Sequence, residues 1–355
     1  MLGIDPRAAR AAWTVFLLAL LIAAAYAIRE TLVVFVIALL FGYLLMPLVG
    51  LVARFTPRRI SFALALAIVY LLLVGGMLGL AVTLGSRLVD EANNLAARLP
   101  DLLNNRQWIE QLPLPGWLEP IRARIVETLQ NELNSGGKDV LPYVKSLGGQ
   151  LLSGAKYIVY LVLVPILAFF FLKDGRGIQR EFVKSMIDEN RRPVVEDILR
   201  DIDRLLGEYI RALVLLAIAS FAANILFFAI TGGPYIVLLS VLTGLGEFLP
   251  VVGPAGAGLI VLLVTGLAGY SHMLLYVAFW ILLRMFQDYV LSPYLMGKGV
   301  KLNPILVLFG VLAGEQIAGV LGMFLSVPLI ATLRVLFVRL RRARGVDLVA
   351  VDHNL

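Results

Sequence analysis

The chain has 355 residues, of which 60% are apolar and only 15% are charged, and its mean hydropathy is +0.90. Soluble domains average about 45–50% apolar and about 25% charged residues, so this composition excludes a soluble single domain. Apolar stretches of about 18 residues or more recur along the whole chain, which predicts an all-α, polytopic integral membrane protein. The formal net charge is +7, but the basic residues lie mainly in loops beside apolar stretches, where they orient a membrane protein. Nucleic-acid binding is therefore not expected.

The residue types exclude several kinds of site. The chain has no Cys and two His, which excludes disulfides and zinc sites built on Cys or His clusters. It lacks a metalloprotease helix, a phosphate-binding loop and a Gly-x-Ser-x-Gly elbow. Ser153 and Lys156 match a Ser-x-x-Lys pair, but its partner motifs are missing. We therefore expect no enzyme, no cofactor and no resident metal, and any site must use carboxylates, Arg, amides, hydroxyls and backbone.

Residues 1–85 are expected to hold three transmembrane helices, at 11–28, 32–53 and 60–84. The loop after the second helix contains three arginines and no acid, Arg54, Arg58 and Arg59. Short basic loops face the cytoplasm. We therefore place this loop and the N-terminus inside.

Residues 86–146 are expected to form an extracytoplasmic amphipathic helical segment. Apolar residues recur at helical spacing in two places, first at Leu88, Ala92, Leu95 and Leu99 and again between 118 and 129. We expect two amphipathic helices here. They could pack on each other, lie on the membrane surface or contact a neighbouring subunit, and the membrane surface is the simplest of these choices.

The chain then returns inward through transmembrane helix 4, residues 147–172. Residues 173–209 keep apolar residues at helical spacing and are expected to form cytoplasmic amphipathic helices. A fifth span is expected at 212–230. The basic tail, residues 339–355, places the C-terminus inside.

Residues 210–338 are expected to form the transport region, and their apolar pattern is interrupted twice. Its apolar pieces at 235–246 and 255–269 are too short for about 30 Å of hydrocarbon, which needs about 20 helical residues. They flank Gly246–Pro254, which we expect to be non-helical and to line a polar cavity, because its prolines lack backbone donors. After one full span the pattern breaks again at 303–316. The prediction is about eight transmembrane helices with two broken or re-entrant helical hairpins in the C-terminal half.

Four ionisable residues lie inside this apolar region: Glu247, Arg284, Asp288 and Glu315. A charge at a helix centre costs about 2.5–3.5 kcal/mol on insertion scales, so each needs a reason. Arg284 and Asp288 are four apart and can form an ion pair on one helical face; removing Asp288 would then leave an uncompensated buried cation. Glu247 lies at a break, where half-helix ends bind ions or polar solutes in transporters, although it could instead cap a helix end in water. Glu315 lies in the second break, where a solvated loop carboxylate is the simpler interpretation.

Four groups of residues match a known family. They are the end of helix 4 from Phe170 to Gly175, the stretch Glu247 to Pro254, Gln287-Asp288 followed by Ser292-Pro293, and Asn303-Pro304 followed by Gly314 and Gly322. In these the chain resembles the autoinducer-2 exporter family, also called the PerM-type permeases. The resemblance covers nearly the whole chain and implies about eight spans, a large outside segment, export of a small signalling molecule and a homo-oligomer. It implies a solute or ion site at Glu247, Pro250, Gly253, Pro254, Gln287, Asp288, Asn303, Pro304 and Gly314.

The sequence therefore predicts a secondary transporter of the bacterial inner (plasma) membrane, with both termini cytoplasmic. It would export a small polar solute similar to autoinducer-2 by alternating access, with H⁺ or Na⁺ as the coupling ion. One alternative, which relatives of the family suggest, is a Na⁺(Li⁺)/H⁺ antiporter that uses Glu247 and Asp288 as exchangeable carboxylates. The other is a non-transporting membrane scaffold whose amphipathic segments bind partners.

Overall fold

The computed structural model describes residues 6–55, 62–104, 155–296 and 302–343. All regular elements in these ranges are helices, which confirms the all-α, polytopic class. Within these ranges, four helices are long and apolar enough to cross a membrane: Arg29–Val52, Arg192–Thr231, Met273–Leu295 and Pro304–Arg341. Four shorter apolar helices accompany them: Ala12–Ala27, Leu66–Gly76, Ile236–Gly246 and Val252–Leu267.

The chain forms two compact units, and the first comprises Met1–Tyr70 and Ala155–Glu181. It contains α1 (Pro6–Ala27), α2 (Arg29–Phe55), the start of α3 (Phe62–Asn104) and most of α6 (Ala155–Met186). Aromatic side chains of α6 pack edge to face on this unit, Phe171 against Phe35 and Phe169 against Tyr70. Such apolar contacts, without buried ionic groups among them, are typical of packing between membrane helices.

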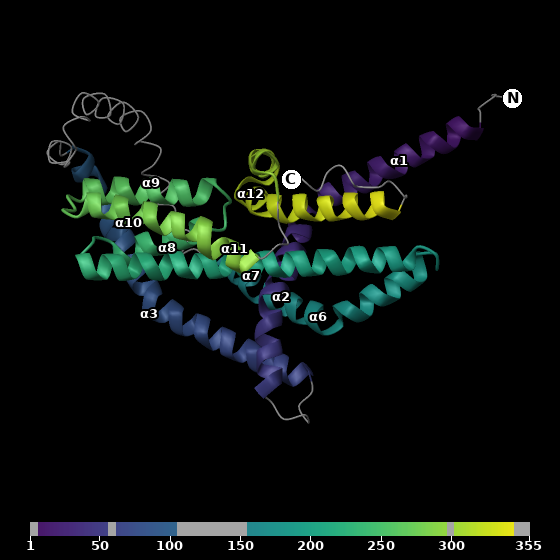
Figure 1. Cartoon of the computed structure of the whole chain (residues 1–355), viewed down its shortest axis with the longest axis horizontal. Coiled ribbons are helices and arrows are strands. Elements are labelled where there is room, and N and C mark those ends of the chain that lie inside the picture. The colour runs from purple at the N-terminus through teal and green to yellow at the C-terminus, as the bar shows by residue number, and fades with distance from the viewer. Residues whose placement is uncertain (1–5, 56–61, 105–154, 297–301, 344–355) are drawn as a thin grey trace. The chain divides into compact units, whose positions relative to one another are not determined.

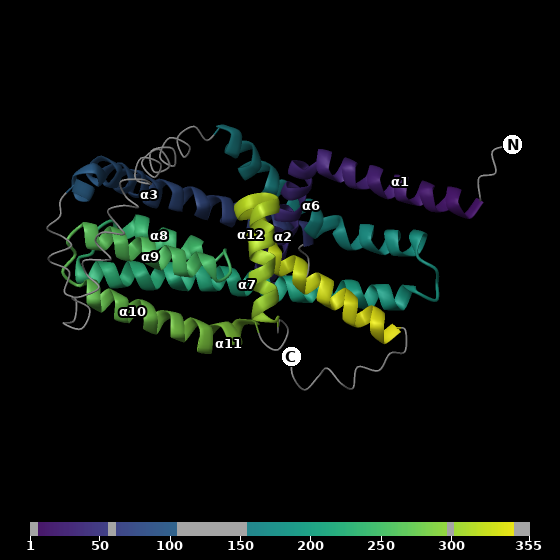
Figure 2. The same cartoon turned by 90° about the horizontal axis from the view of Figure 1, so that it is seen from above.

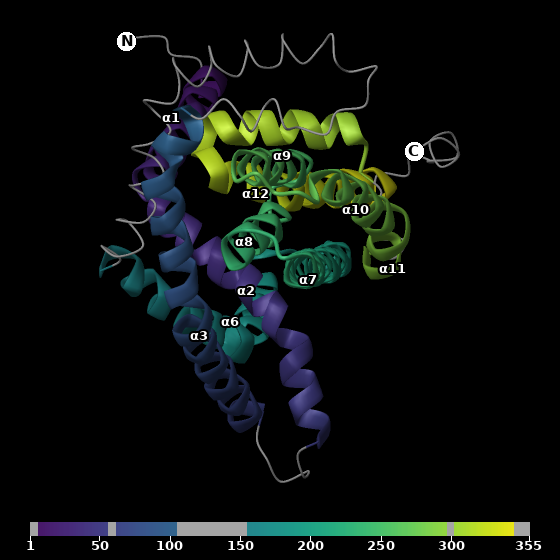
Figure 3. The same cartoon turned by 90° about the vertical axis from the view of Figure 1, so that its left-hand side faces the viewer.

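The second unit comprises Leu71–Gly154 and Phe182–Leu355. Its helices are α7 (Arg192–Thr231), α8 (Ile236–Gly246), α9 (Val252–Leu267), α10 (Met273–Phe286), the π-helix η2 (Gln287–Leu291), α11 (Ser292–Met296) and α12 (Pro304–Ala343). The C-terminal half of α7 lies alongside α8, α9 and α10 (Figures 1 and 2). Figure 3 looks along these helices and shows them as one bundle. This bundle holds the residues around Glu247.

The C-terminal part of α3 packs into the core of this bundle. Leu95 is buried in one apolar cluster with Phe228, Leu239, Val261, Val264 and Tyr276. Glu91, one turn earlier, accepts the backbone N–H groups of Val237 and Leu238 at 3.3 and 2.8 Å. The expectation that this amphipathic helix lies on the membrane surface is therefore wrong, because its apolar face packs on α7–α10. The second expected helix, near 118–129, lies outside the described residues.

Three helices are longer than the sequence patterns indicate, and one of them, α6, joins the end of the expected fourth span to the start of the expected cytoplasmic segment. The expected third span and the amphipathic helix after it form one helix of 43 residues, α3. The expected cytoplasmic helix and fifth span likewise form one helix of 40 residues, α7. The hydropathy changes at 85–86 and at 211–212, but neither place has a Gly-Pro break, so the backbone hydrogen bonds continue through both.

The helix α12 folds back on itself. Its helical backbone is broken at Ala318 and at Gly319, which has φ +60°. A positive φ is costly for residues with a Cβ and free of that cost for glycine. The two arms then pack against each other, with Gly310 against Ile330 and Gly314 against Gly322. The second expected interruption is thus a tight helical hairpin.

Candidate functional site

The first interruption lies between α8 and α9. After Gly246 the backbone N–H groups of Glu247, Phe248 and Leu249 donate to carbonyls three residues earlier, at 3.0–3.2 Å. The helix α9 begins at Val252, so the expected non-helical stretch is wrong for residues 252–254. Pro254 lies in the first turn of α9, where its missing N–H would have had no partner within the helix.

A strained turn at Val251 connects the two helices. The N–H of Val252 donates to the carbonyl of Pro250 at 2.7 Å, and Val251 between them has φ 65° and ψ −56°. This is a γ-turn of the positive-φ form, which is rare and strained, and a β-branched residue with positive φ is an outlier. Strain of this kind collects at ligand sites and switch regions. The turn therefore marks this interruption as a candidate site.

Two glycines bring the arms of this hairpin together. A Cβ added to Gly246 would lie 2.9 Å from the carbonyl oxygen of Gly253, and a Cβ on Gly253 would overlap the carbonyl of Gly246. Only glycine fits at either position, because the obstacle is backbone and cannot rotate away. The contact fixes the backbone on which Glu247 stands.

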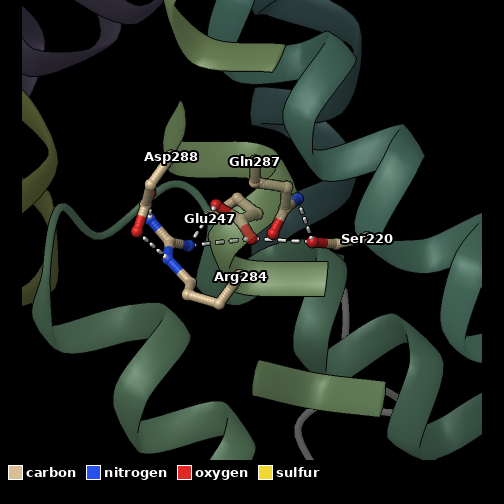
Figure 4. A network of polar contacts seen from close by, with 5 residues as sticks. All are labelled: Ser220, Glu247, Arg284, Gln287 and Asp288. Atoms are coloured by element: carbon tan, nitrogen blue, oxygen red, sulfur yellow. Dashed lines mark hydrogen bonds and ion pairs between the residues drawn. The ribbon is translucent and has the colours of Figure 1, made fainter. Parts of the chain in front are cut away.

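Glu247 is the centre of a network of polar contacts (Figure 4). Its side chain is 6% exposed. Ser220 of α7 donates its hydroxyl to Glu247 Oε1 at 2.7 Å, and Gln287 Nε2 donates to Ser220 Oγ at 2.8 Å. A buried carboxylate is tolerated only when it is paired and hydrogen-bonded. Ser220 supplies the hydrogen bond, and Arg284 supplies the counter-charge, 3.3 Å from Oε2.

Arg284 also contacts a second carboxylate. Its Nε donates to Asp288 Oδ2 at 3.0 Å and its Nη2 to Asp288 Oδ1 at 2.6 Å, the ion pair that the i, i+4 spacing predicts. The side chain of Asp288 is 48% exposed and that of Arg284 is 33% exposed. The expectation that losing Asp288 leaves an uncompensated buried cation therefore does not hold, because Arg284 reaches water and keeps Glu247.

These residues line a small pocket between α7, α8, α9 and α10. The space open to the centre of a water molecule is about 10 Å³, near the minimum for one water. Above the network, the hydroxyl of Tyr276 donates to Asn224 Oδ1 at 3.1 Å, and Asn224 Nδ2 donates to the Ser220 carbonyl at 2.8 Å. The pocket thus has room for about one water molecule in this conformation. It is lined by Ser220, Asn224, Thr243, Glu247, Pro254, Trp280, Leu283, Arg284 and Gln287.

A π-helix begins at the pocket. Gln287 is its first residue, and it extends to Leu291. Single turns of π-helix inside α-helices occur frequently at functional sites. Here the π-helix begins one turn after Arg284 and contains Asp288, so the change of helix type falls within the polar network.

The comparisons with known proteins agree with this architecture. The profile described as "AI-2E family transporter" matches residues 15–342. The chain belongs to the AI-2E transporter family.

Several members of this family resemble the chain along most of their length. YrrI of Bacillus subtilis, named as a transport protein, is 25% identical over 323 residues, covering 89% of this chain and 88% of YrrI. A transport protein of Methanothermobacter thermautotrophicus is 27% identical over 317 residues, covering 86% and 87%. The AI-2 transport protein TqsA of Escherichia coli is 26% identical over 340 residues, covering 92% and 90%. The chain is therefore a member of a membrane-transport family.

The structure brings some of the residues that the resemblance to the AI-2E family implied to one place. Glu247, Pro254 and Gln287 line the pocket, and Asp288 contacts its wall through Arg284. Pro250 and Gly253 form the hairpin tip beside the pocket instead of its lining.

The remaining implied residues lie in the second interruption. Asn303 Oδ1 accepts the N–H of Ile305 at 2.8 Å, so Asn303 caps α12, and Pro304 is the first helical residue. Gly314 faces Gly322 across the bend of α12. The structure does not place these three residues at the pocket that contains Glu247, and Glu315 is exposed.

One aromatic contact joins the two interruptions. The rings of Phe248 and Phe324 have centroids 6.0 Å apart. The hairpins also share a short pattern, since a Gly-Glu pair lies in each, Gly246-Glu247 at the end of α8 and Gly314-Glu315 one turn before the bend at Ala318 and Gly319. The glutamate is buried in the first hairpin and exposed in the second.

Four pocket residues were not singled out from the sequence: Ser220, Thr243, Trp280 and Leu283. Ser220 lies one turn before Asn224 in an otherwise apolar stretch of α7, and this polar pair was the available signal. Thr243 lies one turn before Glu247. Trp280 gave no signal, because its place depends on Gly258 of α9, where a Cβ would overlap the nearest atom of the indole ring.

Proposed function

We propose that the chain is a secondary transporter that exports a small polar solute by alternating access. The observation that carries this proposal is Glu247, a buried carboxylate at a broken helix, held by Ser220, Arg284 and Gln287 in an apolar bundle. Ionisable groups at such depth mark solute and ion pathways, and broken helices form the binding sites of many secondary transporters. Membership of the AI-2E family supports the same function.

The solute binds at this pocket when the bundle opens. Carboxylate, guanidinium, amide and hydroxyl groups converge on it, and together they offer donors and acceptors to a small polar molecule. Because one relative is named as an AI-2 transport protein, autoinducer-2 is the first solute to test. The protein acts in the bacterial inner membrane as a homo-oligomer, with both termini in the cytoplasm.

Two competing functions make different demands. A Na⁺(Li⁺)/H⁺ antiporter needs carboxylate oxygens free for a metal cation, whereas Glu247 already faces the guanidinium of Arg284. A scaffold that does not transport needs no buried carboxylate, and burying one is costly. Both features favour a solute transporter.

Flux measurements with the purified full chain in proteoliposomes test the proposal. Vesicles are loaded with autoinducer-2, and its efflux is followed with a pH gradient, a sodium gradient or neither. We expect efflux from the parent and a loss of at least ten-fold in Glu247→Gln, which keeps shape and removes charge. Glu196→Gln, an exposed carboxylate on α7, serves as the control and should match the parent.

The other outcomes are equally informative. Exchange of sodium for protons without efflux of the solute would establish the antiporter. If neither the solute nor ions cross the membrane under any gradient, the non-transporting scaffold becomes the favoured function. Parental efflux by Glu247→Gln would remove Glu247 from the site.

A further inference from the structure

Arg284 holds its two carboxylate partners in different ways. It meets Asp288 through two nitrogens at 2.6 and 3.0 Å, a two-point geometry that is the stronger form of this pair. It meets Glu247 through Nη1 alone, 3.3 Å from Oε2 and 3.4 Å from Oε1. The guanidinium is therefore anchored on the exposed carboxylate and only approaches the buried one.

The two oxygens of Glu247 also differ. Oε1 accepts the hydroxyl of Ser220 at 2.7 Å as well as the longer contact from Arg284. Within the described part of the chain, Oε2 accepts from Arg284 alone. Oε2 can therefore gain a proton while the short hydrogen bond from Ser220 to Oε1 stays in place.

The described helices packed around Glu247 contain few other charged residues. The sequences of α8, α9 and the part of α7 after Arg211 contain no Asp, Glu, Lys, Arg or His. On the helix that begins with α10, the charged groups facing Glu247 are Arg284 and Asp288, and the phenol of Tyr276 bonds to Asn224. Glu315 of α12 is exposed.

We propose that Asp288 is a positioning residue that retains Arg284 when a proton neutralises Glu247, so that the proton is the coupling ion of this site. The proton comes from water on one side of the membrane and binds Oε2, and the contact from Arg284 to Oε2 is released. Arg284 remains paired with Asp288, so the guanidinium stays in place beside Glu247. On the other side the proton leaves for water and Arg284 returns to Glu247.

The alternative coupling ion fits the same atoms poorly. A sodium ion requires several oxygen atoms directed at it, but the oxygens of Glu247 and Ser220 already accept from Arg284, Ser220 and Gln287. It would also lie beside a guanidinium of the same sign. A proton needs only one oxygen lone pair.

This inference rests on the proposed function, and its test separates the two. The first measurement is proton uptake by the purified full chain in detergent after a rapid drop in pH, followed with a pH-sensitive dye and no solute present. We expect uptake by the parent that exceeds uptake by Glu247→Gln by one proton per chain. Equal uptake by the two would overturn the inference and leave solute transport as a separate question, to be answered by efflux.

The second measurement is the pH profile of efflux in proteoliposomes. In Asp288→Asn, Glu247 is the remaining carboxylate partner of Arg284 in this network. A proton that binds Glu247 must then displace Arg284 from its last carboxylate, so the dependence of efflux on pH should differ from that of the parent. Asp288→Glu restores a carboxylate and should restore most of the parental profile, and Glu196→Gln should not move it.

A merely structural role of Asp288 predicts something else. It would lower the amount of folded protein and the efflux at every pH, without moving the profile. An Asp288→Asn protein with the parental profile would overturn the inference even if efflux continued.

Discussion

The carboxylate of Glu91 on α3 accepts the backbone N–H of Leu238 in the first turn of α8, at 2.8 Å. The N-cap residue of α8, Tyr235, has left-handed backbone angles and no capping side chain. The side chain of Glu91, which lies 146 residues before Val237, therefore accepts the N–H groups that an N-cap side chain usually accepts. This bond attaches the C-terminal part of α3 to the hairpin that contains Glu247.

Replacing Glu91 with Ala should destabilise this attachment. Two N–H groups at the start of α8 lose their acceptor, and losing a cap costs about 0.5–2 kcal/mol. The thermal unfolding midpoint of the purified protein should fall accordingly. Asp90→Ala removes the adjacent exposed carboxylate and is the matched control. If both variants unfold at the same temperature as the parent, the cap contributes nothing.

Gly253→Ala should strongly reduce the amount of folded protein. The new methyl would overlap the backbone carbonyl of Gly246, and forced overpacking typically costs about 1–3 kcal/mol or more. Gly256→Ala, on the same helix α9, has no neighbour within 4 Å and should be neutral or gain up to about 1 kcal/mol in helix propensity. Size-exclusion profiles and unfolding midpoints compare the two. Equal behaviour would contradict the backbone contact.

Val251→Gly should stabilise the protein or leave its stability unchanged. Glycine relieves a positive φ that costs a β-branched residue about 1–3 kcal/mol, and it adds about 0.4–1 kcal/mol of freedom to the unfolded chain. Val252→Gly changes the first residue of α9, where a glycine relieves no positive φ, and should lose up to about 0.5–1 kcal/mol. Unfolding midpoints check the order of the two variants. A larger loss for Val251→Gly would mean that this turn is not strained.

Tyr276→Phe should lower stability modestly. Tyr276 is fully buried, and its hydroxyl is the donor to Asn224 Oδ1. Hydrogen bonds between membrane helices contribute about 0.6–2 kcal/mol. Tyr289→Phe, whose ring is 77% exposed, is the control. Unfolding of both variants in the same detergent gives the comparison, and a control that loses as much as Tyr276→Phe would refute the assignment.

The sequence was most informative where the determinants are local. Hydropathy predicted membrane helices, and proline and glycine predicted the break after Gly246, because these signals depend on neighbouring residues alone. The pair of Arg284 and Asp288 follows from a spacing of four. The contact of Arg284 with Glu247 joins residues 37 apart, and only the packing of α10 beside the hairpin creates it.

The errors have the same origin. A fall in hydropathy near residue 85 was interpreted as the end of a helix, although the backbone of α3 continues because nothing in its sequence stops it. The place of Leu95 and Glu91 depends on α7–α10, more than 130 residues later. Neither periodicity nor charge indicates which face of another element will cover a helix.

The π-helix at Gln287–Leu291, which follows α10, contains one residue more in its turn than an α-helix would. If these five residues tightened into α-helical geometry, everything after them would turn by about 100° around the helix axis, the rotation of one residue. Gln287, the first residue of the π-helix, would keep its bond to Ser220, whereas Ser292 and α11 would present a different side to their neighbours. These five residues would thus allow α11 to rotate about the helix axis in one discrete step while the residues that line the pocket stay in place.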